Sequence, residues 1–147
     1  MGAGLLCVLA CAAPMRLRLQ GQLATARQAL MATPNVNDSP APAFRYLELA
    51  DRYARRYPND SLRTGYLFVA ADVARGLGEA QRAISLWERV RKDSTATEAP
   101  TALFLQGFTA ETQLQDRRRA AAYYRSFLRQ YPAHPLAAQV RQLLSLL

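Results

Sequence analysis

From Phe44 onward, the amino-acid sequence repeats itself with a period of 37 residues. An arginine recurs at the same point of three successive copies, as Arg45, Arg82 and Arg119. Four apolar positions follow it in each copy: Tyr46, Ala83 and Ala120; Leu49, Leu86 and Tyr123; Ala50, Trp87 and Tyr124; Tyr53, Val90 and Phe127. Their spacing of i, i+3, i+4 and i+7 marks one face of an α-helix. Because self-similarity at a fixed period is typical of stacked repeats, the sequence predicts an all-α helical-repeat array over residues 44–147.

The segments between these helices repeat with the same offset, as Leu62–Arg75, Ala99–Thr112 and Leu136–Leu147. Breaks at Gly76–Gly78 and Gln113–Asp116 separate the first two segments from the next copy. We therefore expect helical hairpins, about two to three repeats, with Leu136–Leu147 as a C-terminal capping helix. That last helix is rich in leucine. Either it packs against the previous pair, or it offers an apolar docking patch to a second copy of the chain.

The chain outside the repeat begins with an uncharged, mostly apolar run of 12 residues, Gly2–Ala13. It is too short to span a bilayer but has the length of the apolar region of a signal peptide, although no lysine or arginine precedes it. Two cleavage patterns overlap within it. Val8–Cys11 resembles the lipobox of bacterial lipoproteins, in which the cysteine is lipidated, and Ala10–Ala12 resembles an ordinary signal cleavage site. A third interpretation is a plain apolar N-terminal helix.

We accordingly divide the chain into a signal-like segment at 1–13, an N-terminal helix and Pro-rich loop at 14–43, and the repeat array at 44–147. The helix is expected over Met15–Met31, and three prolines predict the loop over residues 32–43. Lipidation at Cys11 would anchor the protein to a membrane of the cell envelope. The alternative compartment is the cytoplasm.

The repeat resembles the tetratricopeptide repeat (TPR) family. The residues that carry the resemblance in one copy are Leu67, Ala71, Ala74, Gly78, Ala83, Trp87 and Val90. Those of the next copy are Phe104, Gly107, Ala120, Tyr124, Phe127 and Pro132. This second copy has one extra residue before its turn, and Gln115 stands where the family prefers glycine. Together with the lipobox-like segment, the layout is similar to that of small bacterial envelope lipoproteins with TPRs.

The resemblance implies a concave groove lined by the first helix of each pair, in which a protein or peptide binds. Carried over to this sequence, the groove positions are Gly65, Phe68, Asp72, Arg75 and Gly76, followed by Ala102, Leu105, Thr109 and Thr112. Phe68 and Leu105 would supply apolar pockets, and Asp72 and Arg75 would grip peptide backbone or charge. The competing interpretation is that Phe68 and Leu105 are core residues.

The reactive side chains are too few to suggest an enzyme. The sequence has one histidine, His134, and two cysteines, Cys7 and Cys11, both near the N-terminus. A His/Cys metal site or a nucleophile–histidine pair needs a second well-placed partner that the sequence does not supply. We therefore expect no catalytic residues, no metal and no cofactor.

The formal net charge of +8 permits binding to nucleic acid, anionic lipid or an acidic protein. In the first two copies acids stand four residues before basic residues and pair with them, whereas the third copy has only Asp116 near its arginines, Arg117, Arg118, Arg119, Arg125 and Arg129. An RNA-binding protein of the cytoplasm is thus the alternative to an envelope adaptor. Tyr53, Trp87 and Tyr124 occupy repeat-core positions, so we expect them to pack rather than stack on bases.

Overall fold

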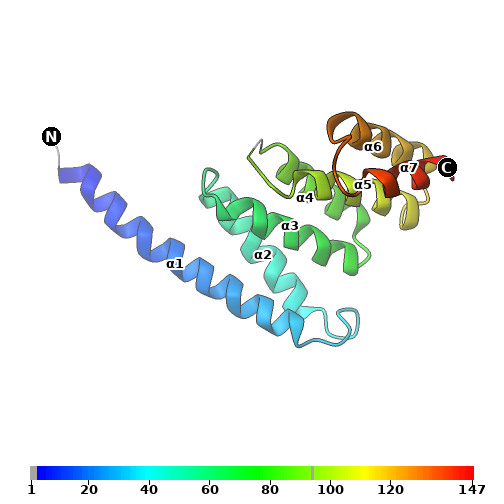
Figure 1. Cartoon of the computed structure of the whole chain (residues 1–147). Helices are drawn as coiled ribbons and strands as arrows, with labels where there is room; N and C mark the ends of the chain where they lie inside the picture. Colours follow the sequence, from blue (N-terminus) through cyan, green and yellow to red (C-terminus); the bar gives the residue numbers. More distant parts are fainter. Residues whose placement is uncertain (1–2, 94) are drawn as a thin grey trace. The chain divides into compact units, whose positions relative to one another are not determined.

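The computed structural model describes residues 3–93 and 95–147, with side chains from Pro14 onward. Within these residues the chain forms seven α-helices and no strand, which confirms the all-α fold (Figure 1). The helices are α1 (Ala3–Met31), α2 (Ala41–Arg56), α3 (Leu62–Gly76), α4 (Ala80–Arg91), α5 (Ala99–Thr112), α6 (Arg117–Gln130) and α7 (Ala137–Ser145). They form two compact units, one up to Asp60 and the other from Ser61 to Leu147.

In the first unit, α1 and α2 form an antiparallel hairpin (Figure 1). Among the described side chains of α1, Leu19, Leu23 and Ala26 are buried, and the Gln20 Nε2 donates a hydrogen bond to the Tyr53 hydroxyl at 2.9 Å. The hairpin differs from the sequence-based expectation at the start of each helix, whereas α1 ends at Met31 as expected. α1 begins before Met15 and continues through Pro14, and α2 begins at Ala41 because Pro42 occupies the first turn, where a missing N–H breaks no helical hydrogen bond.

The second unit stacks α3 on α4, α4 on α5, α5 on α6, and α6 on α7. Helices α3, α5 and α7 match the predicted segments Leu62–Arg75, Ala99–Thr112 and Leu136–Leu147 to within two residues. α7 buries Ala137 and Val140 in a core shared with Leu103, Tyr124 and Phe127. Leu143, Leu144 and Leu147 pack partly against the same core, so the last helix caps the array.

The burial pattern repeats with the period read from the sequence. The buried residues of α4 are Ala80, Ala83, Ile84, Leu86, Trp87 and Val90. Their counterparts 37 positions earlier, in α2, are all buried: Ala43, Tyr46, Leu47, Leu49, Ala50 and Tyr53. Four of their counterparts in α6 are buried as well: Ala120, Ala121, Tyr124 and Phe127. The predicted core face of these three helices is confirmed.

Between α3 and α5 the offset is 36 residues instead of 37. Shifted by 36, the buried positions of α3 fall on residues 100, 103, 106, 107, 109 and 110, and all of these except Pro100 are buried. The extra residue lies in the turn after α5. The turn after α3 closes with a hydrogen bond from the Glu79 N–H to the Ala74 carbonyl, and its counterpart after α5 runs from the Asp116 N–H to the Ala110 carbonyl, one residue wider.

Both turns place one residue in the left-handed backbone region. Gly78 has a φ of +78° and Gln115, 37 positions later, has a φ of +54°. A left-handed φ is free for glycine but costs a residue with a Cβ about 1 kcal/mol. The second turn therefore has a residue with a Cβ at the left-handed position where the first turn has a glycine.

α5 and α6 approach each other so closely at residue 107 that only glycine fits there without a shift of its neighbours. A Cβ built on Gly107 would lie 2.6 Å and 2.7 Å from two ring carbons of Tyr124. The absent side chain lets the Tyr124 ring lie against the α5 backbone. Gly107 therefore sets the distance between these two helices.

Candidate interaction surfaces

The predicted groove residues of α3 share one exposed side of that helix. Phe68 and Arg75 are half-buried, and Asp72 is exposed. The Arg75 guanidinium donates two hydrogen bonds to one Asp72 carboxylate oxygen, from Nε at 3.1 Å and from Nη2 at 2.8 Å. This ion pair fixes the orientation of the Arg75 side chain, so α3 presents an aromatic ring followed by an ordered charged pair.

The groove residues carried over to α5 need a correction. Thr109 and Ala102 have exposed fractions of 0%, so neither side chain is accessible to a partner, and Leu105 is half-buried. The reason is the 36-residue offset, which moves the equivalents of Phe68, Asp72 and Arg75 to Phe104, Phe108 and Glu111. Because of the extra residue, the side chains on the exposed side of α5 are not those that a shift of 37 residues predicts.

The exposed side of α5 carries a row of aromatic rings. Phe104 and Phe108 stack with their ring centroids 6.1 Å apart, and Phe104 stacks on the buried Tyr124 at 6.5 Å. The Tyr124 hydroxyl donates to the Glu111 carboxylate at 2.7 Å, and burial together with this carboxylate raises the pKa of Tyr124. Core packing and a hydrogen bond therefore hold one end of this aromatic row in place.

α3 and α5 meet near their C-terminal ends, where the Gln113 Nε2 donates to the Arg75 carbonyl at 3.0 Å. We call the exposed sides of these two helices the open face. Its residues are Phe68, Asp72, Arg75, Phe104, Phe108 and Glu111. α4 and α6 cover the other sides of α5, so the open face is the remaining accessible side of that helix.

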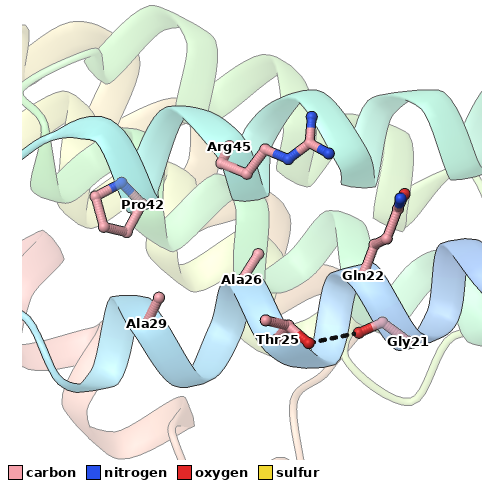
Figure 2. Close-up of a pocket in the computed structure, with 7 residues that line it drawn as sticks. All are labelled: Gly21, Gln22, Thr25, Ala26, Ala29, Pro42 and Arg45. Carbon is pink, nitrogen blue, oxygen red and sulfur yellow. Dashed lines mark hydrogen bonds between the residues drawn. The ribbon is translucent and has the colours of Figure 1, made fainter.

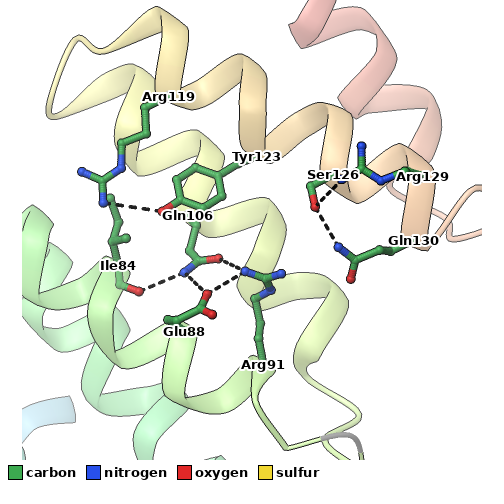
Figure 3. Close-up of polar contacts among 9 residues, drawn as sticks. All are labelled: Ile84, Glu88, Arg91, Gln106, Arg119, Tyr123, Ser126, Arg129 and Gln130. Atoms are coloured by element: carbon green, nitrogen blue, oxygen red, sulfur yellow. Dashed lines mark hydrogen bonds and ion pairs between the residues drawn. The ribbon is translucent and has the colours of Figure 1, made fainter.

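A buried polar cluster between α4 and α5 was not predicted from the sequence (Figure 3). The Gln106 amide is completely buried, and its Nε2 donates to the Ile84 carbonyl at 3.0 Å and to Glu88 at 3.3 Å. Arg91 donates to the Gln106 Oε1 at 3.0 Å and to Glu88 at 2.7 Å. Because every polar atom of the Gln106 side chain is paired, the cluster fixes how α5 docks on α4.

The five arginines of the predicted basic surface do not lie together. Arg119 points toward α4, where it donates to the Gln81 side chain at 2.9 Å and lies over the Tyr123 ring (Figure 3). Arg129 contacts Ser126 at 3.5 Å. The remaining three arginines, Arg117, Arg118 and Arg125, line a small pocket beside α7.

The large aromatic residues of the repeat core are inaccessible. Tyr53, Trp87 and Tyr124 are fully buried, as the repeat predicted, so none of them offers a stacking surface for a base. Within the described residues, the Trp87 Nε1 and the Thr109 Oγ1 are buried without a hydrogen-bond partner.

A crevice of about 390 Å³ lies between α1 and α2 (Figure 2). Small or short side chains line it, including Gly21, Ala26, Ala29 and Pro42. The one charged residue at its rim, Arg45, already pairs with Glu48 at 3.1 Å. The crevice therefore provides space but no group that would select a ligand.

Several predictions concern residues or groups outside these surfaces. The side chain of Cys11, the predicted lipidation site, lies outside the described side chains. In the described part of the chain, no three His, Cys, Asp or Glu side chains gather closely enough to hold a metal ion, and no helix has the length and apolar character needed to cross a membrane. His134 makes an edge-on contact with Phe127 and accepts a hydrogen bond from the Leu136 N–H.

The comparisons with known proteins give no assignment. No protein-family model matches the chain, and no curated protein matches it either.

Proposed function

We propose that this chain is a non-catalytic binding module of the tetratricopeptide kind, which holds a peptide segment of another protein on its open face. The observation that carries the proposal is the accessible apolar side of α5. Phe104, Leu105 and Phe108 are only half-buried there, whereas the outer sides of α4 and α6 carry charged residues. Large apolar side chains that remain partly uncovered on one side of a helix are typical of a surface covered by a partner.

The neighbouring groups suit a peptide rather than a small molecule. The Asp72–Arg75 ion pair offers a carboxylate and a guanidinium beside the aromatic rings. Together they match apolar side chains of a bound segment and the polar groups of its backbone. The Gln106 cluster and the close packing at Gly107 hold α5 rigidly, so a peptide would bind a preformed surface with little ordering cost.

The test uses a double variant, Phe68→Ser with Phe108→Ser. Peptides would be selected from a random displayed library on the wild-type chain, and their affinities measured on both proteins. We expect apolar-rich peptides whose affinity falls about tenfold or more in the double variant, because truncating a central aromatic anchor typically costs 1–2 kcal/mol or more. Met31→Ser, a change at a 79% exposed residue of α1, is the matched control. Selected peptides that bind the double variant as tightly as wild type would contradict the proposal.

We further propose that the module works in the bacterial cell envelope, anchored through acylated Cys11. The support is the lipobox-like Val8–Cys11 segment at the end of an apolar run. The intact mass of the mature protein, compared between wild type and Cys11→Ser, tests this. A wild-type protein that keeps residues 1–10 and carries no lipid mass would contradict the anchor and favour the cytoplasm.

A further inference from the structure

A small pocket between α6 and α7 combines an apolar floor with a basic rim. Its volume is about 240 Å³. α6 contributes Arg117, Arg118, Ala121 and Arg125 to its lining, α7 contributes Leu144, and Leu147 follows α7. The two helices lie side by side in Figure 1. No residue of α3 or α5 lines the pocket, so it is independent of the open face.

Among the described residues, no aspartate or glutamate pairs with the arginines of the pocket. Within the described residues, Arg118 and Arg125 form no ion pair, and no acidic residue lines the pocket. Arg117 donates to the Leu146 carbonyl at 2.8 Å, which holds its guanidinium over the end of α7. This bond keeps one positive group in place before any ligand arrives.

The repeat shows that this charge arrangement is particular to α6. The residue 37 positions before Arg125 is Glu88, and the residue 37 positions before that is Asp51. Asp51 pairs with Arg55, and Glu88 pairs with Arg91 at 2.7 Å. Arg125 therefore replaces an acid, and it stands four residues before Arg129, where two like charges repel each other. An anion bound between the arginines would relieve this repulsion.

We propose that this pocket binds an acidic segment of a partner protein that inserts one apolar side chain. The planar guanidinium groups of Arg118 and Arg125 match carboxylates, which they bind through paired N–H donors. Ala121, Leu144 and Leu147 accept the apolar side chain. The volume is below the roughly 300–1,000 Å³ of sites for drug-sized ligands, so it accommodates a single side chain and not a lipid chain.

The test uses the full chain and fluorescein-labelled peptides at about 0.15 M salt. The probes are Glu-Glu-Leu-Glu-Glu and Glu-Glu-Ala-Glu-Glu, and binding is measured by fluorescence anisotropy. We expect the leucine peptide to bind about tenfold more tightly than the alanine peptide, because the leucine side chain buries more apolar surface. Arg125→Glu should weaken leucine-peptide binding by about tenfold or more, since it removes a charge-assisted contact and adds repulsion.

Two controls separate this site from general attraction. Arg27→Glu makes the same charge change at an exposed residue of α1 and should alter the affinity less than about twofold. Leu144→Ala should abolish the preference for leucine over alanine while keeping the charge dependence. Folding of each variant is checked by its thermal midpoint, which Arg125→Glu should leave unchanged or raise.

Three results would overturn the proposal. They are equal binding of the two peptides, equal losses in Arg27→Glu and Arg125→Glu, and the absence of peptide binding. In the last case, binding to phosphatidylglycerol vesicles that Arg125→Glu abolishes would assign the pocket to an anionic membrane surface instead. Because the open-face variants leave every pocket residue intact, failure here is distinguishable from failure of the proposed function.

Discussion

α2 and α6 occupy the same position in the repeat, but the charged residues on their outer sides are very different. In α2, Glu48 accepts hydrogen bonds from both Arg45 and Arg52, at 3.1 Å and 2.7 Å, and Asp51 pairs with Arg55. In α6 the residues at the positions of Glu48 and Asp51 are Ala122 and Arg125. Arg119 and Arg129 of α6 correspond to Arg45 and Arg55 of α2, but α6 has no acid at the positions that pair with them in α2.

Inside the protein the same two helices agree. Four of the buried positions of α2 are also buried in α6, and at two of them the large and small residues exchange places: α2 has Tyr46 and Ala50 where α6 has Ala120 and Tyr124. Core positions tolerate such volume-conserving exchanges but not polar groups. The comparison indicates that packing restricts the residues on the inner side of each repeat to apolar ones. The outer side has no such restriction, so its charges can change to suit a partner.

The largest expected effect comes from the exchanged core positions. Tyr124→Ala gives α6 the small residue that α2 carries at the same position, but without the compensating tyrosine one turn earlier. We expect it to lower the free energy of unfolding by about 3–5 kcal/mol, because a buried aromatic ring leaves a large cavity. Chemical denaturation measures this. Tyr123→Ala, at a half-buried neighbour, should cost clearly less, and equal losses would contradict the packing described here.

The second prediction concerns the helices that pair with α2 and α6. Gly107→Ala should destabilise the protein by about 1–2 kcal/mol, because the new Cβ meets the Tyr124 ring and the overpacking outweighs the gain in helix propensity. Gly21→Ala in α1 meets nothing within 4 Å, so it should stabilise by about 0.5–1 kcal/mol. Thermal unfolding of the two variants checks this, and a stabilising Gly107→Ala would refute the close approach of α5 and α6.

The third prediction tests the turn that precedes α6. Gln115→Gly should stabilise the protein by about 0.5–1 kcal/mol, because glycine adopts the positive φ without the steric cost of a Cβ. Gly78→Gln at the matching turn should destabilise by a similar amount. If both substitutions shifted the denaturation midpoint in the same direction, the two turns would not be equivalent.

The smallest effect concerns the outward charges themselves. Arg125→Asp should stabilise by about 0.3–0.5 kcal/mol, because it restores an i,i+4 pair with Arg129 like that of Asp51 and Arg55. Asp51→Arg should destabilise α2 by about the same amount. Both differences should shrink at about 1 M salt, where exposed charges are screened beyond roughly 3 Å. Salt-independent differences would indicate a cause other than charge.

Much of this architecture follows from sequence periodicity. The 37-residue spacing correctly predicted the core faces of α2, α4 and α6 and the ends of α5, since apolar spacing reports directly on burial. The same spacing wrongly predicted that Thr109 lines a groove. The turn after α5 is one residue longer than the turn after α3, so the residues of α5 correspond to those of α3 at an offset of 36 and not 37. This shift of one residue changes which side chains of α5 are exposed but leaves the predicted ends of the helix correct.

Other features depend on contacts between residues far apart in the sequence. The Gln106 cluster joins groups 15 to 22 positions apart, and Arg117 reaches the carbonyl of Leu146. No local pattern indicates either contact, because each depends on how two helices dock. The pocket between α6 and α7 cannot be predicted from the sequence for the same reason, although the basic helix and the apolar C-terminal helix that form it are both evident there.

The most direct test of the difference between α2 and α6 is hydrogen exchange of the full chain with and without the Glu-Glu-Leu-Glu-Glu peptide. A partner-binding surface on α6 predicts slower exchange over residues 117–125 and 140–147 when the peptide is present. Residues 41–56, in which Arg45, Arg52 and Arg55 are already paired with acids of α2, should exchange at an unchanged rate. Equal slowing in both helices, or slowing confined to α2, would contradict the account.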